Sequence, residues 1–208
     1  MDMQLFTDAV RSSIAAGKWN ALDDWIVEDC SLMFKDGNAS LFDPVDDAFV
    51  DFVIGLLSDP VYLDVKNSFQ LLYVVEAEWQ LISTHQKTAL LPALEAAYPR
   101  FHDPMARFMT AELLGDFYGD EPALQTLQRL ASLPDASLRE LVPMGLGHLI
   151  RSPDVQLAER ARSLLNTMAE DPSENVRGEV GIALRKASPT SERVKRKKKH
   201  RRPSKRND

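Results

Sequence analysis

The chain has 208 residues, of which 44% are hydrophobic and 27% are charged. This composition is typical of a folded globular protein, and with one cysteine it excludes a disulfide-rich scaffold, a collagen and a fully disordered chain. The formal net charge of −6 conceals two oppositely charged parts, because residues 192–208 carry net +8 and residues 1–191 carry net −14.

Proline after Asp or Ser marks the expected helix starts. An Asp or Ser side chain accepts the free N–H groups of a first helical turn, and proline at the next position has no N–H to lose. The segments between these pairs carry apolar residues at helical spacing, whereas alternation with a period of two is scarce. The pairs are Asp43-Pro44, Asp59-Pro60, Asp103-Pro104, Ser152-Pro153 and Asp171-Pro172.

These patterns predict an all-α protein of roughly ten helices joined by short loops. Residues 70–75 are the one segment that resembles a strand, but they continue into good helix formers, which favours a buried helix. Pro143 should bend the helix in which it lies, since it removes one backbone hydrogen bond. The expected helices are 3–16, 19–34, 44–57, 65–83, 86–98, 104–118, 121–132, 136–151, 153–169 and 173–187.

The second half of the chain contains an internal repeat. Three segments align on Arg107, Arg139 and Arg177, which are 32 and 38 residues apart. Four positions after each arginine comes a small residue or proline, and seven positions after it comes a leucine, for which we expect equivalent buried positions. A helix pair of this size cannot bury its apolar face alone, so stacked neighbours would provide the core. The three leucines are Leu114, Leu146 and Leu184.

This pattern resembles HEAT-like α-solenoid repeats over about residues 86–187. In that family a first helix leads through a turn with Asp-Pro into a second helix that carries Val-Arg and then small residues. Asp171, Val176 and Arg177 follow this order most closely. The resemblance implies antiparallel helix pairs stacked as an α-solenoid.

The expected domain organisation is simple. Residues 1–187 should form a single all-α domain, in which 1–85 are an irregular helical part and 86–187 are the HEAT-like repeats. Residues 188–208 should be a disordered basic tail, because they hold almost no apolar residues and a dense run of like charges.

The sequence has no recognisable catalytic or metal signature. None of the four histidines lies at metal-ligand spacing, and Cys30 lies on the apolar stripe of its helix, as packed thiols do. Gly145 and Gly147 fall inside an expected helix rather than after a strand, so they should allow two helices to approach closely instead of binding phosphate. We therefore expect no enzymatic activity, no metal and no cofactor.

Acidic residues crowd several helices, and we interpret one group as a partner surface. Asp43, Asp47 and Asp51 recur at i+4 spacing, which places them on one helix face. They either form a solvated face or attract and hold a basic protein. Trp25 lies off the main apolar stripe of its helix, so it either packs against a second neighbour or anchors a partner. Our predicted partner-binding residues are Asp43, Asp47, Asp51 and Trp25.

The basic run near the end of the chain has no interleaved aromatic residue, so charge alone should determine its binding. Three uses stay open: a nuclear-import signal in a eukaryote, a nucleic-acid tether, and an arm that contacts the chain's own acidic surface. The predicted contact residues are Lys195, Arg196, Lys197, Lys198, Lys199, Arg201 and Arg202.

Together these features predict a non-enzymatic helical-repeat protein that binds another macromolecule. The first hypothesis is an inhibitor or adaptor whose acidic surface covers a basic protein, by analogy of size and charge with immunity proteins that neutralise nuclease toxins. The alternative is a nucleic-acid-associated HEAT-like protein tethered by its basic tail. No apolar run approaches the roughly 20 residues that span a bilayer, and a lone cysteine suits a reducing compartment, so we expect the cytoplasm, or the nucleus in a eukaryote.

Overall fold

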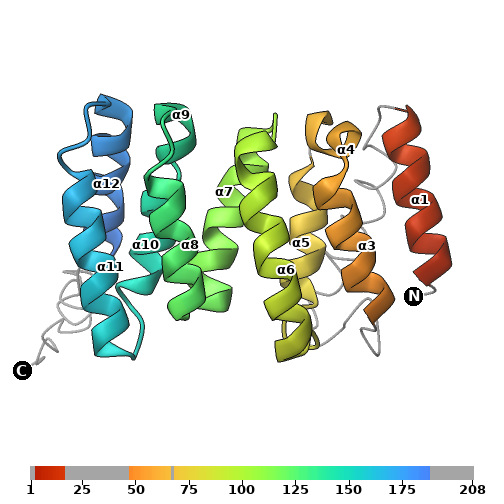
Figure 1. Cartoon of the computed structure of the whole chain (residues 1–208), viewed down its shortest axis with the longest axis horizontal. Helices are drawn as coiled ribbons and strands as arrows, with labels where there is room; N and C mark the ends of the chain where they lie inside the picture. The colour runs from red at the N-terminus through yellow and green to blue at the C-terminus, as the bar shows by residue number, and fades with distance from the viewer. Residues whose placement is uncertain (1–2, 17–46, 67, 188–208) are drawn as a thin grey trace, which may run out of the picture.

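The computed structural model describes residues 3–16, 47–66 and 68–187, and Figure 1 shows their arrangement. Every regular element within these ranges is a helix, which confirms the all-α prediction for the described part of the chain. The first elements are α1 (Met3–Ala16), α3 (Asp47–Ser58), α4 (Pro60–Asp64), α5 (Phe69–Ala77), α6 (Thr84–Ala97) and the 3₁₀ turn η1 (Tyr98–Arg100). They are followed by α7 (Pro104–Glu112), the π-helical η2 (Leu113–Tyr118), α8 (Glu121–Ala131), α9 (Ala136–Arg139), α10 (Val142–Leu149), α11 (Val155–Met168) and α12 (Glu174–Ala187).

One predicted helix is divided in two, and another is shorter than expected. The expected helix at 136–151 is divided into α9 and α10, and Pro143 stands in the first turn of α10, where its missing N–H costs nothing. The expected helix at 65–83 is confined to α5, which includes the strand-like residues 70–75 as predicted. A separate short helix, α4, begins at Pro60 instead. The helix expected at 19–34 lies outside the described residues.

Aspartate caps start several helices. The side chains of Asp59 and Asp103 each accept a hydrogen bond from the backbone N–H two residues later, at 2.8 and 2.9 Å, in the first turns of α4 and α7. Asp171 accepts from the N–H of Ser173 at 2.8 Å, but α12 begins at Glu174, so Asp171 lies in the turn before the helix and the start predicted there is wrong. The start predicted at Ser152 is wrong. Asp154 caps α11, because the Ser152 hydroxyl accepts from the N–H of Asp154 and the helix begins two residues later than expected.

The helices pack in two rows. In the first row α3, α6, α8 and α11 contact one another in succession. In the second row α5, α7, α10 and α12 do the same, and α10 also packs against α8 and α11 across the rows. The helices stand side by side along the long axis of the molecule in Figure 1. Each row therefore presents one long outer surface, and we call the outer side of α5, α7–η2, α10 and α12 the second-row surface.

Two apolar clusters fill the space between the rows. The first includes Phe6, Phe49 and Leu71, and the second includes Leu127 and Leu165. Leu114 and Leu146 are fully buried in the second cluster, as the repeat alignment predicts. Leu184 is only partly buried, so its predicted equivalence is wrong. The neighbouring Ala183 takes the buried contact with α10, because α12 is turned by one residue relative to the alignment.

The two clusters meet where backbones touch. A Cβ atom on Gly115 would lie 2.2 Å from the carbonyl oxygen of Gly145, and a Cβ on Gly145 would lie 2.4 Å from the carbonyl oxygen of Ala111. Gly147 approaches Ala183 of α12 in the same way, at 3.2 Å from its Cβ. The expectation that Gly145 and Gly147 allow close helix approach is therefore confirmed.

Two of the three aligned arginines, Arg139 and Arg177, hold turns between helices, whereas the Nε atom of Arg107 is buried without a hydrogen-bond partner in the described part of the chain. Arg139 donates to both carboxylate oxygens of Asp171, at 2.8 and 2.9 Å, and to the carbonyls of Leu133 and Pro134, both at 2.8 Å. The Arg139 and Asp171 side chains are 11% and 10% exposed. Arg177 donates in turn to the carbonyls of Asp171 and Pro172. Asp171 thus holds the turn before α12 and anchors the preceding helix pair, and Arg139 and Arg177 have a structural role.

We expect Gly145→Ala to destabilise the protein by about 1–3 kcal/mol, because the added methyl group meets a backbone carbonyl that cannot move aside. Gly178→Ala is the matched control, since nothing lies within 4 Å of its Cβ position and alanine favours a helix interior by roughly 0.5–1 kcal/mol. Denaturant unfolding of both variants checks this prediction. Equal stability of the two would contradict the observed close approach.

Arg139→Ala should cost about 3–5 kcal/mol, because it leaves the Asp171 carboxylate largely buried without its partner. Arg129→Ala removes an exposed pair with Glu95 and should cost no more than about 1 kcal/mol. Thermal and denaturant unfolding measure the difference. Similar losses for the two variants would show that the Arg139 pair does not hold the helix pairs together.

Candidate functional site

The structure describes two of the four predicted partner-binding residues. Asp47 and Asp51 lie one turn apart on α3, in the first row, and both are exposed. The Asp47 carboxylate accepts a hydrogen bond from Gln86 Nε2 at 2.8 Å. Asp47 and Asp51 share one face of α3, as their spacing of four residues predicts. Their role in binding a partner stays a prediction. Asp43, Trp25 and the seven basic residues of the tail lie outside the described residues.

The sequence reasoning missed a second acidic group, on the second-row surface. Glu76 of α5, Glu112 of α7 and Asp116 of η2 come from consecutive elements of that row, and we call them the carboxylate group. His148 of α10 lies beside them, with Nδ1 3.0 Å from Asp116 Oδ1 and Nε2 4.0 Å from Glu112 Oε1. Four elements therefore bring three acids and one imidazole together.

Glu76 is the most perturbed member of the carboxylate group. Burial and the charges of Glu112 and Asp116 raise its pKa from 4.5 to about 8. Its Oε1 atom is buried and has no hydrogen-bond partner in the described part of the chain. Near neutral pH the Glu76 carboxyl is therefore largely protonated, and a positive charge placed beside it would favour the ionised form.

His148 is also contacted by Arg151, whose Nη2 lies 2.9 Å from His148 Nδ1. Arginine can only donate, and a carboxylate can only accept. The same Nδ1 therefore cannot satisfy both Arg151 and Asp116: a protonated Nδ1 donates to Asp116, and a bare Nδ1 accepts from Arg151. Asp116 and Arg151 therefore meet at the same edge of the imidazole, whereas Glu112 lies at its Nε2 edge.

The π-helical η2 positions this group. Its wider turn brings Phe117 and Tyr118, neighbours in sequence, both against Trp79, with ring centroids 5.9 and 4.6 Å apart. Lys87 Nζ lies 4.6 Å from the Trp79 ring centroid, and the Tyr118 hydroxyl donates to the Lys87 carbonyl at 2.7 Å. These contacts line a cavity of about 250 Å³ and hold η2 against α5 and α6. Isolated π-helical turns are frequent at functional sites.

A periodic signal in the sequence could have revealed the site. Glu76, Glu112 and His148 recur at intervals of 36 residues, close to the arginine spacings of 32 and 38. Residues that share a repeat position lie on the same face of successive helices. Stepping through the chain at that interval would have grouped these side chains, whereas local charge density pointed to α3 instead.

Comparison with known proteins does not name the chain: no protein-family model, no curated protein and no solved structure matches it. Among the described helices, none has the length and apolar character needed to cross a membrane. Within the same residues no cluster of three or more His, Cys, Asp or Glu side chains has an arrangement suited to a metal ion.

The raised pKa of Glu76 predicts a pH-dependent stability. Between pH 4.5 and 8 the folded protein keeps a proton on Glu76 that the unfolded chain has lost. The contribution of this proton to folding stability is complete below about pH 4.5 and is lost as the pH rises through 8. Glutamine stays neutral at every pH. We therefore expect Glu76→Gln to raise the melting temperature relative to the parent at pH 8.5, and to change it little at pH 5.

Thermal unfolding followed by circular dichroism at both pH values measures this effect. Glu159→Gln on the exposed side of α11 is the control, and its effect should be the same at the two pH values. A Glu76→Gln effect that does not depend on pH would contradict the perturbed carboxyl group.

Proposed function

We propose that this chain is a HEAT-like α-solenoid that binds a basic protein and carries out no chemistry of its own. Three features support the solenoid: two rows of helices that pack in succession, aspartate caps at the starts of α4, α7 and α11, and the turns that Arg139 and Arg177 close. Stacked helix pairs create long surfaces that suit the binding of extended partners.

The observation that carries the proposed function is the carboxylate group. Burial of the Glu76 carboxyl, together with the charges of Glu112 and Asp116, raises its pKa so that Glu76 holds a proton near neutral pH. A lysine or arginine side chain of a partner would relieve the repulsion among the three acids, and Glu76 would then release its proton. The carboxylate group is therefore arranged to bind a cation more tightly than the same acids spread over a surface.

The acids of α3 have a different part in this proposal. Asp47 and Asp51 are exposed, and Asp47 already accepts a hydrogen bond from Gln86. Exposed charges of this kind mainly accelerate the encounter with an oppositely charged partner and are screened beyond about 8 Å at physiological salt. We assign steering to the acids of α3 and binding to the carboxylate group.

The role that suits such a surface is that of an inhibitor, in the manner of an immunity protein that covers a nuclease toxin, or of an adaptor in an assembly. Both roles need a surface that covers the basic face of a partner protein. The expected compartment is the cytoplasm, or the nucleus in a eukaryote.

Calorimetry with a synthetic octalysine peptide tests the proposal on the full chain. At pH 7.5, in two buffers with different ionisation enthalpies, binding should release most of one proton, because the bound cation lowers the pKa of Glu76. Glu76→Gln should bind without proton release. The double variant Glu112→Gln/Asp116→Asn should bind about tenfold more weakly, which corresponds to roughly 1.4 kcal/mol.

Asp47→Asn/Asp51→Asn is the matched control, since it removes the same charge from α3. The affinity of this variant should stay within about twofold of the parent. The removal of its two charges should instead lower the association rate. Loss of binding in this control, with the carboxylate variants unaffected, would place the site on α3. Proton release that persists in Glu76→Gln would also refute the proposal.

A further inference from the structure

Exposed apolar side chains accompany the carboxylate group on the second-row surface. In the described part of the chain the exposed large apolar side chains include Tyr73 on α5 and Met105 on α7, which are 39% and 45% exposed. Glu76 lies on α5 and Glu112 lies on α7. The same two helices therefore carry both acids of the carboxylate group and exposed apolar groups.

Helical spacing places these side chains on one face of each helix. The charge of Glu112 acts on Glu76, so these two acids show which faces of α5 and α7 are turned toward the carboxylate group. An α-helix has 3.6 residues per turn, so residues seven positions apart return to the same face. Phe69 lies seven residues before Glu76, and Met105 lies seven residues before Glu112. Each helix thus aligns an apolar side chain with an acid.

Two aromatic side chains continue this alignment between its ends. Tyr73 and Phe108 lie three and four residues before the acids of their helices, within about 60° of the same face. The Tyr73 ring packs edge to face against Phe69, with centroids 5.7 Å apart. Phe69 and Phe108 are half-buried against the first apolar cluster, which fixes their positions. We call Phe69, Tyr73, Met105 and Phe108 the apolar strip.

The helices α5 and α7 pack together and run in the same direction. The backbone N–H of His102, just before α7, donates to the carbonyl of Leu63, shortly before α5, at 2.9 Å. Glu76 and Glu112 lie together at the opposite ends of the two helices. The apolar strip therefore occupies the first part of both helices, and the acids lie about 10.5 Å further along the axis, at about 1.5 Å per residue.

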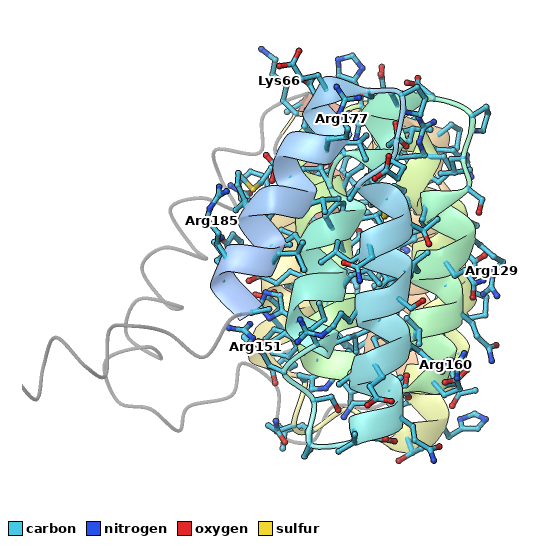
Figure 2. The ribbon with its side chains drawn as sticks, turned by 90° about the vertical axis from the view of Figure 1, so that its left-hand side faces the viewer. Lys66, Arg129, Arg151, Arg160, Arg177 and Arg185 are labelled. Carbon is cyan, nitrogen blue, oxygen red and sulfur yellow. The ribbon has the colours of Figure 1, made fainter. Side chains whose placement is uncertain are left out.

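The basic side chains near this surface leave it open to a cationic partner. The helix α5 contains no Lys or Arg, and α7 contains only Arg107, whose charge acts on Tyr98 and on Asp135 at the start of α9. Lys66 is exposed and lies three residues before α5. Figure 2 shows Lys66 at the upper end of the side on which Arg185 of α12 also lies. Lys66 would repel a partner's cation from the apolar end, which favours the acidic end for that cation.

We propose that the apolar strip and the carboxylate group together bind one amphipathic helix of a basic protein, laid along α5 and α7. On this helix a long apolar side chain lies two turns from a lysine or arginine. Seven residues of a helix cover about 10.5 Å, so one partner helix can reach the apolar strip and the acids at the same time. The inference rests on the proposed function, because the carboxylate group must bind the cation of that helix.

The two parts of the surface contribute differently to this binding. Side chains that dock an amphipathic helix in this way are spaced by three, four or seven residues along one helix face. Apolar and aromatic contacts supply most of the binding energy at such interfaces, whereas charges select the partner and its direction. A partner with lysines but no apolar residue at this spacing should therefore bind only weakly.

Calorimetry with three alanine-based helical peptides tests this inference on the full chain. All three carry the same lysines at the centre of one face. The first peptide has leucine seven residues before and after the central lysine, and the second has serine at these two positions. The third has the leucines moved by two residues, to the opposite face. We expect the first peptide to bind at least about tenfold more tightly than the other two, since only its leucines reach the apolar strip.

Tyr73→Ala/Met105→Ala should remove the preference for the first peptide, because it truncates the two most exposed members of the apolar strip. Leu81→Ala/Val155→Ala is the matched control. It truncates side chains that are 44% and 66% exposed and lie outside α5 and α7, so the preference should persist. A preference that survives in the first variant, or equal binding of all three peptides by the parent, would overturn the inference.

Glu112→Gln/Asp116→Asn separates this inference from the proposed function. This variant should bind the serine peptide more weakly than the parent does, because the lysines lose their acidic partners. If it binds the serine peptide as tightly as the parent, the proposed function fails. If the serine peptide depends on the acids but the leucines add nothing, only the further inference fails.

Discussion

The contact between η2 and α10 is the constraint on which the rest of the molecule depends. Gly115 and Gly145 meet backbone to backbone, and Gly145 also touches the carbonyl of Ala111. No side chain fits between the two elements, so their separation and register allow little variation. The two apolar clusters adjoin here, and Tyr118 of η2 packs against both. Stability and site geometry therefore share one interface.

This contact also assembles the polar side chains of the second-row surface. Because η2 and α10 lie so close, Asp116 and His148 reach hydrogen-bonding distance, and Glu112 stands one turn away. The left-handed residue Gly119, with φ of 60°, ends η2 and allows α8 to turn back into the first row. The acids are thus held on the backbones of packed helices. Glu76 keeps its proton near neutral pH first because its carboxyl is buried, and second because the charges of Glu112 and Asp116 cannot move away from it.

Some features of this protein follow from sequence alone, because they depend on residues a few positions apart. Helical spacing predicts the all-α class, and the capping aspartates Asp59 and Asp103 predict the starts of α4 and α7, since a cap and its N–H lie within one turn. Gly145 and Gly147 likewise signal a close approach. Tertiary structure decided what depends on distant partners. Ala183 rather than Leu184 faces α10, and Glu76, Glu112 and His148 converge, although 36 residues separate each from the next. A sequence shows which residues can share a helix face, but only the packing of one helix on another decides which face is turned inward and which charges meet.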